Sequence, residues 1–371
     1  MERSKELLSK KLISFFNSIN IQIYILFGLI LITLISIDYY YKNSNLTIPF
    51  IITTLISSII TLLGIPKLKK IKIKQIIRED GPKNHFLKKG TPTMGGIFFI
   101  PIGVIISNLI YFNTENYKVI LILSFVIISF LLIGFIDDFL SLKKQLNTGL
   151  KFNQKINLQT FVSLIFIIIC ASNNLLPNNI QIANEIFYIG NIIYPLGIFV
   201  LLAESNSTNL TDGLDGLLGG CSVLILTGLA ITILIENPNN NLTLAPLCIV
   251  MAGACMGFLF LNNYPAKIFM GDSGSLAIGA ALGGIALLSD NLWSLLIMGG
   301  ILAAESISVI IQVSIFKISK RLKGKGHKLF LMTPLHHHFE LKGNNEIVIV
   351  GSFWLVTLLL VIINLIFFIH T

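Results

Sequence analysis

Charged residues are scarce in this sequence. They make up 12% of the 371 residues, whereas apolar residues make up 54% and the mean hydropathy is +0.82. Soluble domains carry roughly 25% charged residues, so the composition excludes a soluble multidomain protein, a disordered chain and a coiled coil. The apolar residues suffice for about ten helices of ~20 residues, the length that crosses ~30 Å of hydrocarbon. We therefore expect an all-α, polytopic integral membrane protein.

Cysteine is also rare, and its placement excludes a secreted disulfide scaffold. There is no C-x-x-C pair, and this pattern is typical of small core residues in helices. The sequence also lacks the motif G-x-x-x-x-G-K-[ST], so nothing supports a P-loop nucleotide hydrolase. The cysteines all lie inside apolar runs, at Cys170, Cys221, Cys248 and Cys255.

Long apolar runs predict the membrane spans. The first run lacks a signal-cleavage site and either crosses the bilayer or lies in its interface, so we expect ten or eleven spans. Gly253 with Gly257, and Gly279 with Gly283, predict close helix packing; they permit a homodimer without requiring one. The runs lie at about 20–38, 47–66, 95–112, 118–136, 157–175, 187–204, 216–236, 242–261, 276–289, 293–316 and 347–369.

Basic residues predict the orientation of these spans. With eleven spans, every Lys and Arg except Lys42 and Lys118 lies on one face, and an excess of basic residues marks the cytoplasmic face. If the first run does not cross, only the N-terminal tail changes sides. The net charge is +9, but the basic residues cluster in the loops between apolar runs and do not form a continuous nucleic-acid-binding surface. We therefore expect no nucleic-acid partner. The outer loops are short, and chemistry is expected on the cytoplasmic face.

Aspartates are few, and several lie where predicted spans meet the cytoplasmic face. One such residue is most simply a helix cap, but separate groups on one side of a membrane protein indicate a shared site. Adjacent carboxylates repel unless a cation lies between them, and Mg²⁺ commonly binds one or two carboxylates together with substrate phosphates. An Mg²⁺ site for a phosphate-bearing substrate is therefore predicted from Asp137, Asp138, Asp212, Asp215 and Asp272.

Other polar residues leave alternatives open. Glu305 lies mid-span and Glu204 ends a span, and each is either functional or a partner in a helix–helix hydrogen bond. His336, His337 and His338 are consecutive, so their side chains diverge and a shared transition metal is not expected. One or two of these histidines are expected to bond phosphate or sugar oxygens instead.

Together, these motifs resemble the phospho-N-acetylmuramoyl-pentapeptide-transferases, a family within the polyprenyl-phosphate N-acetylhexosamine-1-phosphate transferases. The aspartate motifs indicate only the superfamily, whereas the triple-histidine loop together with T-P-T-M-G-G indicates the muramoyl-pentapeptide branch. The resemblance rests on R-x-D-G-P-x-x-H-x-x-K-x-G-T-P-T-M-G-G at 78–96, G-F-I-D-D at 134–138, G-L-x-x-x-x-K at 149–155, N-L-T-D-G-L-D-G-L at 209–217, N-x-x-P-A-x-x-F-M-G-D-S-G-S-L at 262–276 and P-L-H-H-H-F-E-L-K-G at 334–343.

The resemblance implies an Mg²⁺-dependent transfer in peptidoglycan synthesis. Undecaprenyl phosphate attacks the β-phosphate of UDP-MurNAc-pentapeptide, lipid I forms and UMP leaves. By motif match Asp272 would be the Mg²⁺ ligand, and Asp137 the proposed base on the lipid phosphate, although that phosphate is largely ionised near neutral pH anyway. Phe269 would stack on uracil. The implied catalytic residues are Asp137, Asp138, Lys155, Asn209, Asp212 and His336, and the implied substrate-binding residues are Lys88, Asp215, Asn262, Phe269, Gln312 and His337.

The resemblance also implies ten spans in a bacterial inner (plasma) membrane, with the active site in the cytoplasm and membrane lipid as a partner. The N-terminal region is longer than expected. Residues 1–45 are therefore interpreted as an extension that adds either a membrane span or a surface helix, and residues 46–371 as the membrane-embedded transferase domain. Two alternatives stay open: a UDP-GlcNAc:undecaprenyl-phosphate GlcNAc-1-phosphate transferase with the same core, and a transporter that uses acids such as Glu305.

Overall fold

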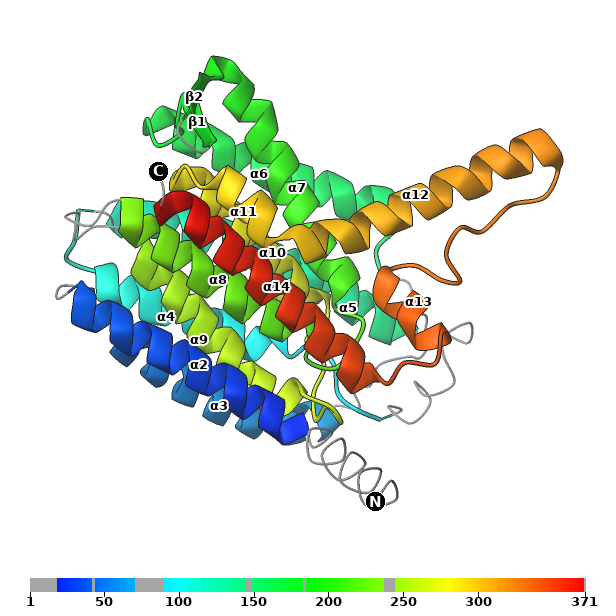
Figure 1. Ribbon diagram of the computed structural model, residues 1–371, viewed down its shortest axis with the longest axis horizontal. Coiled ribbons are helices and arrows are strands. Elements are labelled where there is room, and N and C mark those ends of the chain that lie inside the picture. Colours follow the sequence, from blue (N-terminus) through cyan, green and yellow to red (C-terminus); the bar gives the residue numbers. More distant parts are fainter. Residues whose placement is uncertain are drawn as a thin grey trace, which may run out of the picture.

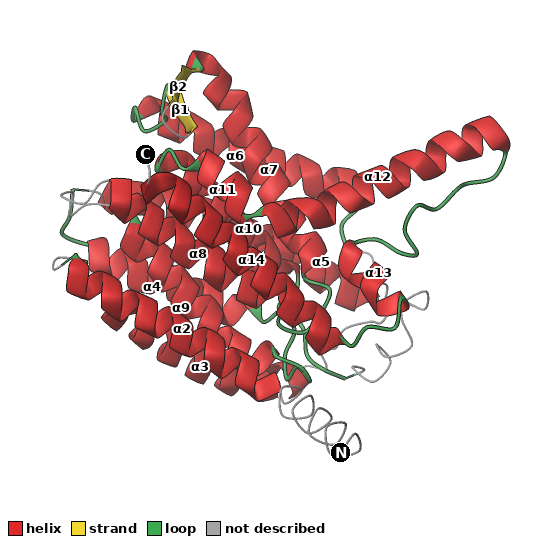
Figure 2. Ribbon diagram, viewed as in Figure 1, coloured by secondary structure: helices red, strands yellow, loops and turns green. Residues whose placement is uncertain are grey.

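The computed structural model describes residues 19–41, 44–70, 90–115, 117–144, 149–182, 185–236 and 244–369. Within these residues the chain is helical apart from loops and one antiparallel hairpin (Figures 1 and 2), as expected of the all-α class. The helices are α2 (Ile19–Tyr40), α3 (Thr47–Lys70), α4 (Gly96–Tyr111), α5 (Tyr117–Lys144), α6 (Phe152–Ser172), α7 (Ile193–Thr211), α8 (Leu217–Glu236), α9 (Ala245–Asn262), α10 (Asp272–Leu288), α11 (Leu292–Met298), α12 (Gly300–Lys323), α13 (Leu335–Leu341) and α14 (Glu346–Ile369), with a 3-10 turn η2 (Gly190–Ile192) and strands β1 (Asn179–Ile182) and β2 (Glu185–Tyr188).

Eight of the described helices are long and apolar enough to cross a membrane: α2, α3, α5, α6, α8, α9, α12 and α14. Two shorter apolar helices, α4 and α10, accompany them. The chain is therefore a multi-pass membrane protein. The first predicted run forms α2, which has the length and composition of a span.

Helices α8, α9 and α10 form the centre of the bundle. In α8 and α9, 89% of the most apolar segment is buried, compared with 22% in α2 and α12. Every residue of α10 from Ser273 to Leu287 is buried. The outer helices expose large apolar side chains, such as Ile32 on α2 and Leu109 on α4. Such an exposed apolar surface is what contact with lipid requires.

Glycines bring the central helices close to their neighbours. A Cβ added at Gly257 of α9 would lie 2.4 Å from the carbonyl oxygen of Thr54 in α3. A Cβ added at Gly279 of α10 would lie 2.4 Å from Cα of Ser205 in α7. The prediction that the two G-x-x-x-G pairs serve close helix packing is confirmed.

One predicted span is in fact two helices. The run 293–316 divides at Gly299 into α11 and α12, so its prediction as a single helix is wrong. Gly299 is followed by Gly300, and two consecutive glycines strongly lower helix propensity. Beyond this break α12 leaves the bundle at an oblique angle (Figure 1).

Helix α5 is longer than predicted. The sequence predicts that this run ends at 136, but α5 continues to Lys144. Asp137 and Asp138 therefore lie inside the helix rather than at its end. Residues 136–144 contain no glycine or proline, and Lys143 and Lys144 in the last turn interact favourably with the helix dipole.

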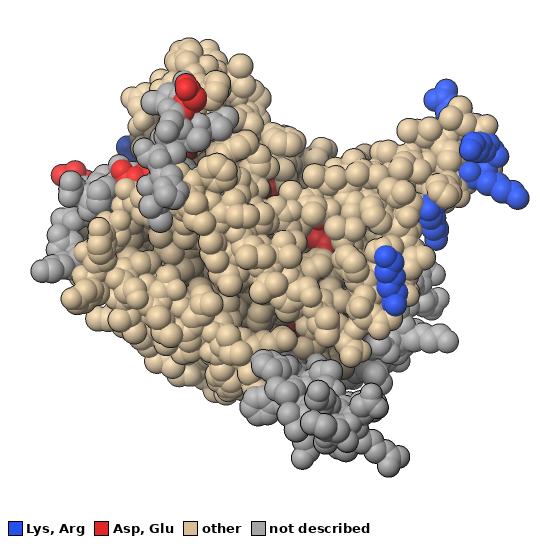
Figure 3. Space-filling model, viewed as in Figure 1, with Lys and Arg blue, Asp and Glu red and all other residues tan. Residues whose placement is uncertain are grey.

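The hairpin lies mostly between the predicted runs 157–175 and 187–204, and its second strand extends into the start of the latter run. Strands β1 and β2 pair antiparallel, with Ile180 opposite Phe187, and they connect α6 to α7. Lys155 lies in the first turn of α6 (Phe152–Ser172), so roughly 26 Å of helix separates it from the end of α6 that leads to the hairpin. Figure 3 shows basic side chains gathered at the far end of α12, away from the hairpin.

Candidate active site

The candidate site begins where α5 crosses the first turn of α10. A Cβ added at Gly134 would lie 2.1 Å from the carbonyl oxygen of Asp272, so only glycine permits this approach. Four residues further along α5, the carboxylate of Asp138 accepts hydrogen bonds from the backbone N–H groups of Asp272 and Ser273, both at 3.1 Å. Asp138 thus caps α10 from another helix, where the dipole favours a negative charge.

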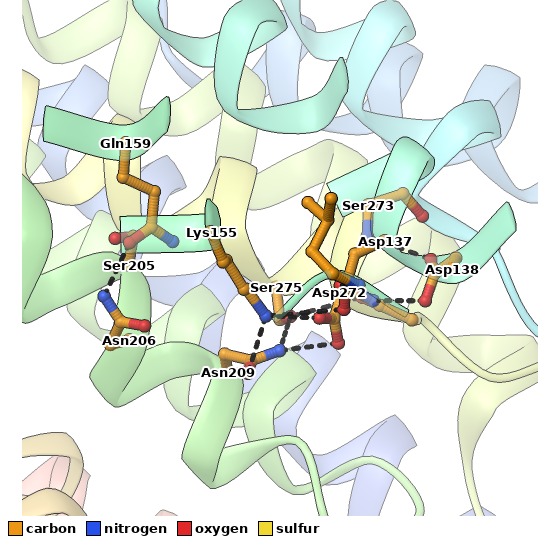
Figure 4. A network of polar contacts seen from close by, with 12 residues as sticks. Asp137, Asp138, Lys155, Gln159, Ser205, Asn206, Asn209, Asp272, Ser273 and Ser275 are labelled. Carbon is orange, nitrogen blue, oxygen red and sulfur yellow. Dashed lines mark hydrogen bonds and ion pairs between the residues drawn. The ribbon is translucent and has the colours of Figure 1, made fainter. Parts of the chain in front are cut away.

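Lys155 connects the carboxylates of this region. Its Nζ forms an ion pair with Asp272 and lies 3.7 Å from Oδ2 of Asp137 and 3.4 Å from Oδ1 of Asn209. The side chains of Lys155, Asp137 and Asp272 keep 14%, 16% and 25% exposure, so the cluster is open to a ligand. Figure 4 shows these side chains converging from α5, α6, α7 and α10.

Asn209 fixes the end of α7 to the start of α10. Its Nδ2 donates to Oδ1 of Asp272 at 2.8 Å and to Oγ of Ser275 at 3.0 Å. The neighbouring Thr208 hydroxyl donates to the carbonyl oxygen of Ser275 at 2.8 Å. Predicted site residues from four distant stretches therefore meet in one cluster.

Asp137 is oriented by the segment that precedes α6. The backbone N–H of Leu150 donates to Oδ1 of Asp137 at 2.7 Å. A Cβ added at Gly149 would lie 2.1 Å from the carbonyl oxygen of Asp137, so glycine is needed for this contact. The other carboxylate oxygen, Oδ2, faces Lys155.

Asp215 and Asn262 hold two loops together. Oδ2 of Asp215 accepts a hydrogen bond from the N–H of Ala266 at 2.9 Å. Asn262 accepts one from the N–H of Gly216 at 3.1 Å and donates to the carbonyl oxygen of Ile268 at 2.9 Å. Both side chains are buried. In this structure they act on the shape of the site through the backbone of 212–216 and 263–271.

Glu346 is a residue of this region that the sequence motifs do not predict. Its Oε1 accepts a hydrogen bond from the N–H of Asp215 at 2.7 Å and so ties the start of α14 to the 212–216 loop. The only signal for it in the sequence is an acid directly before the last apolar run. Asp212 itself follows the last residue of α7, where its N–H bonds to the carbonyl oxygen of Thr208 at 3.1 Å.

Phe269 and Gln312 each bond to the backbone of a loop. The N–H of Phe269 bonds to the carbonyl oxygen of Pro92 at 2.8 Å, and its carbonyl oxygen accepts from Gly95 at 2.8 Å. Gln312 of α12 accepts hydrogen bonds from the N–H groups of Leu329 and Phe330. Its amide also donates to the carbonyl oxygen of Phe330, so it shapes the last loop. Lys88, predicted to bind substrate, lies outside the described residues.

The three histidines have different environments, as consecutive residues should. His336 is fully buried, whereas the His337 side chain keeps 15% exposure and bonds to Glu340 at 2.7 Å. Nδ1 of His338 accepts a hydrogen bond from the N–H of Leu331 at 3.2 Å. Burial, and secondarily the positive charge of Lys342, lower the pKa of His338 below its ordinary value.

The cluster suits a hard divalent cation. Two carboxylates, Asp137 and Asp272, face the ammonium group of Lys155, and a third, Asp138, accepts hydrogen bonds from the N-terminus of α10. Among the described residues no three His, Cys, Asp or Glu side chains could hold a metal by themselves. Mg²⁺ needs only one or two carboxylates and completes its shell with water and phosphate oxygens, so Asp272 and Asp137 fit it.

Two protein-family models match the part of the chain that contains this cluster or lies next to it. A family model described as "Glycosyl transferase family 4" matches residues 120–290, which include the cluster. A second model, "Phospho-N-acetylmuramoyl-pentapeptide-transferase signature 1", matches residues 88–100.

Relatives named phospho-N-acetylmuramoyl-pentapeptide-transferase extend the match over the chain. The protein of Prochlorococcus marinus strain NATL2A is 81% identical over the whole of both chains. The protein of Prochlorococcus marinus strain MIT 9313 is 49% identical over 88% of this chain and 88% of its own. A protein from Synechococcus sp. strain CC9311 is 47% identical over 89% of this chain and 90% of its own.

Proposed function

Because the chain belongs to the phospho-N-acetylmuramoyl-pentapeptide-transferase family, we propose that the cluster of Asp137, Lys155, Asn209 and Asp272 is its active site. There the chain transfers phospho-MurNAc-pentapeptide from UDP-MurNAc-pentapeptide to undecaprenyl phosphate, which gives lipid I and UMP. The observation that carries the proposal is the convergence of these side chains on one partly exposed point.

Charge explains why this cluster suits the reaction. A phosphate oxyanion must approach a diphosphate that is itself negative, so positive charge is needed between the reactants. Lys155 supplies part of it. Asp272 and Asp137 would hold Mg²⁺, which when bound stabilises the diphosphate and the leaving UMP. Asn209 and Lys155 hold the Asp272 carboxylate in place before substrate arrives, and such preorganisation lowers the barrier.

The nucleotide is proposed to lie toward Phe269. Base stacking on an aromatic ring contributes ~1–3 kcal/mol, and Phe269 comes three residues before Asp272 in the chain. Asp215 and Asn262 shape this side by their bonds to the neighbouring loops, and Gln312 and His337 border it from α12 and α13. Lys88 and Asp212 complete the proposed set of substrate and active-site groups.

The active site is proposed to face the cytoplasm of a bacterial inner membrane. The far end of α12 carries Lys320, Arg321 and Lys323, and α5 ends in Lys143 and Lys144 near the site. The hairpin at the other end of α6 would then lie outside the cytoplasm.

A homodimer and the division into residues 1–45 and 46–371 remain part of the proposal. In the described part of the N-terminal segment, the Phe27 ring stacks on Phe50 at 6.0 Å.

Substrate choice is tested by supplying two sugar nucleotides to the purified protein with undecaprenyl phosphate. We expect UMP release with UDP-MurNAc-pentapeptide and little with UDP-GlcNAc. Turnover of UDP-GlcNAc alone would contradict the proposal and favour the related GlcNAc-1-phosphate transferase. Solute flux in liposomes without UMP release from either nucleotide would favour a transporter.

A further inference from the structure

Glu305 is a buried acid that the proposed chemistry does not use. It lies in α12 and its side chain is fully buried. Oε2 accepts a hydrogen bond from the N–H of Leu335 at 2.6 Å, and Oε1 accepts one from the N–H of His336 at 3.2 Å. Oε1 also lies 3.2 Å from Nδ1 of the same histidine. These contacts explain how a carboxylate is tolerated here, because each charged oxygen has a donor.

The contact with Glu305 fixes the protonation pattern of the His336 ring. A carboxylate only accepts hydrogen bonds, so Nδ1 must carry the proton. The ring is thereby held in one orientation, with Nε2 pointing away from Glu305. Nε2 is buried and has no hydrogen-bond partner among the described residues.

Nε2 of His336 points at Gly213. A Cβ added at Gly213 would lie 2.0 Å from Nε2, 2.7 Å from Cε1 and 3.0 Å from Cδ2 of the ring. All three nearest atoms belong to His336. The φ of Gly213 is not among the positive values in this structure, so its backbone does not itself require glycine. The glycine is needed because the ring occupies the space of a side chain.

The ring therefore touches the loop that carries two of the predicted site aspartates. Gly213 lies between Asp212 and Asp215, and this loop is otherwise held by Asn262 and Glu346. Glu305, in turn, is anchored in a long helix, α12. A continuous path of contacts joins α12, the short helix α13 and the 212–216 loop.

We propose that Glu305 is a positioning residue that acts through His336: it holds the ring against Gly213 and so sets the position of the loop bearing Asp212 and Asp215 at the active site. The family resemblance implies a catalytic role for His336, whereas the burial of its ring supports positioning instead. The effect on catalysis rests on the proposed function, whereas the contact itself does not. A misplacement of about 1 Å in such a loop can cost about 10²-fold in rate.

A cycle of variants tests the contact between His336 and Gly213. Gly213→Ala, His336→Ala and the double variant are purified, and UMP release and thermal unfolding are measured for each. We expect Gly213→Ala to lower kcat/KM by about 10²-fold, and the double variant to match His336→Ala alone, because the added methyl then has space. The control is Gly28→Ala, whose added Cβ meets nothing within 4 Å.

Additive losses in the double variant would overturn the proposal, and so would near wild-type activity of Gly213→Ala. Coupled residues deviate from additivity, whereas independent ones do not. If the substitutions merely destabilised the fold, activity and melting temperature would fall in every variant. The second substitution would then not offset the effect of the first.

The role of Glu305 is tested by Glu305→Gln and by the ¹⁵N signals of the histidine rings. In the wild type we expect the Nδ1 signal of His336 to be that of a protonated nitrogen. In Glu305→Gln we expect this signal to change and kcat to fall while KM for the nucleotide stays within about threefold. An unchanged ring signal or unchanged kcat would overturn the proposal.

These measurements separate the inference from the proposed function. If the wild-type protein releases no UMP, the proposed function fails, whereas the melting temperatures and ring signals still test the contact. If UMP is released but the variants are additive, only the inference fails.

Discussion

At the scale of single residues, two adjacent aspartates have different roles. Both carboxylate oxygens of Asp138 accept hydrogen bonds from backbone N–H groups of α10. Asp137 uses Oδ1 for the N–H of Leu150 and turns Oδ2 toward Lys155. Asp138 is therefore mainly a cap that sets the direction of α10, and Asp137 is the member of the pair available to a cation or substrate.

Lys155 is the one described cation in this carboxylate cluster, so its charge should matter for catalysis. We expect Lys155→Met to reduce UMP release by about 10²–10³-fold, as for removal of one preorganised electrostatic donor. Lys151→Met is the control, because Lys151 is exposed one turn earlier. Steady-state UMP release measures both, and similar losses in the two variants would contradict the assignment.

Phe269→Ala should weaken nucleotide binding more than it slows saturated turnover. Loss of one stacked base costs ~1–3 kcal/mol, or roughly 5–150-fold in affinity. Titration calorimetry with UDP-MurNAc-pentapeptide gives the affinity, and saturated UMP release gives kcat. An unchanged affinity would count against stacking.

The sequence predicts Asp137, Lys155, Asn209 and Asp272 as site residues, and these side chains meet in the structure. It could not indicate how Asn262 and Gln312 act, since an amide binds either ligand or backbone depending on which loop lies opposite. Glu346 was missed for the same reason: its partner, the N–H of Asp215, is distant in sequence. Glu305 was singled out with its role left open, and its partner became visible only in three dimensions.

At the scale of elements, the crossing of α5 and α10 determines the site. Gly134→Ala would place a methyl group 2.1 Å from the carbonyl oxygen of Asp272. Because backbone rather than a flexible side chain must move, we expect a loss of ~1–3 kcal/mol in stability and a larger loss of UMP release. Thermal unfolding and activity are compared with Gly28→Ala. Wild-type behaviour of Gly134→Ala would show that the helices are not this close.

Helices were predictable from apolar runs, whereas their ends were not. The extension of α5 to Lys144 carries two aspartates and two lysines among its apolar residues, so hydropathy does not reveal it. The break at Gly299 lies inside a continuous apolar run, and the hairpin strands have only four residues each. Such short features depend on tertiary packing more than on local sequence.

At the scale of the whole molecule, the site and the hairpin should lie on opposite sides of the membrane. The native cysteines are all buried, so a single introduced cysteine can be labelled selectively. Tyr188→Cys in the hairpin should react with a membrane-impermeant maleimide on intact bacterial cells. Leu322→Cys near the end of α12 should react only after permeabilisation. Both native side chains are highly exposed, at 79% and 76%, and the reverse pattern would overturn the orientation.

The central claim is that carboxylates from distant helices serve one Mg²⁺-dependent transfer. It is tested most directly by titrating Mg²⁺ against UMP release for the wild type, Asp272→Asn and Asp290→Asn, the last being a control beyond the opposite end of α10. We expect Asp272→Asn to abolish Mg²⁺-dependent UMP release at an unchanged melting temperature, and Asp290→Asn to retain it. Near wild-type turnover by Asp272→Asn at the same Mg²⁺ concentration would rule out Asp272 as a ligand of a required Mg²⁺ ion.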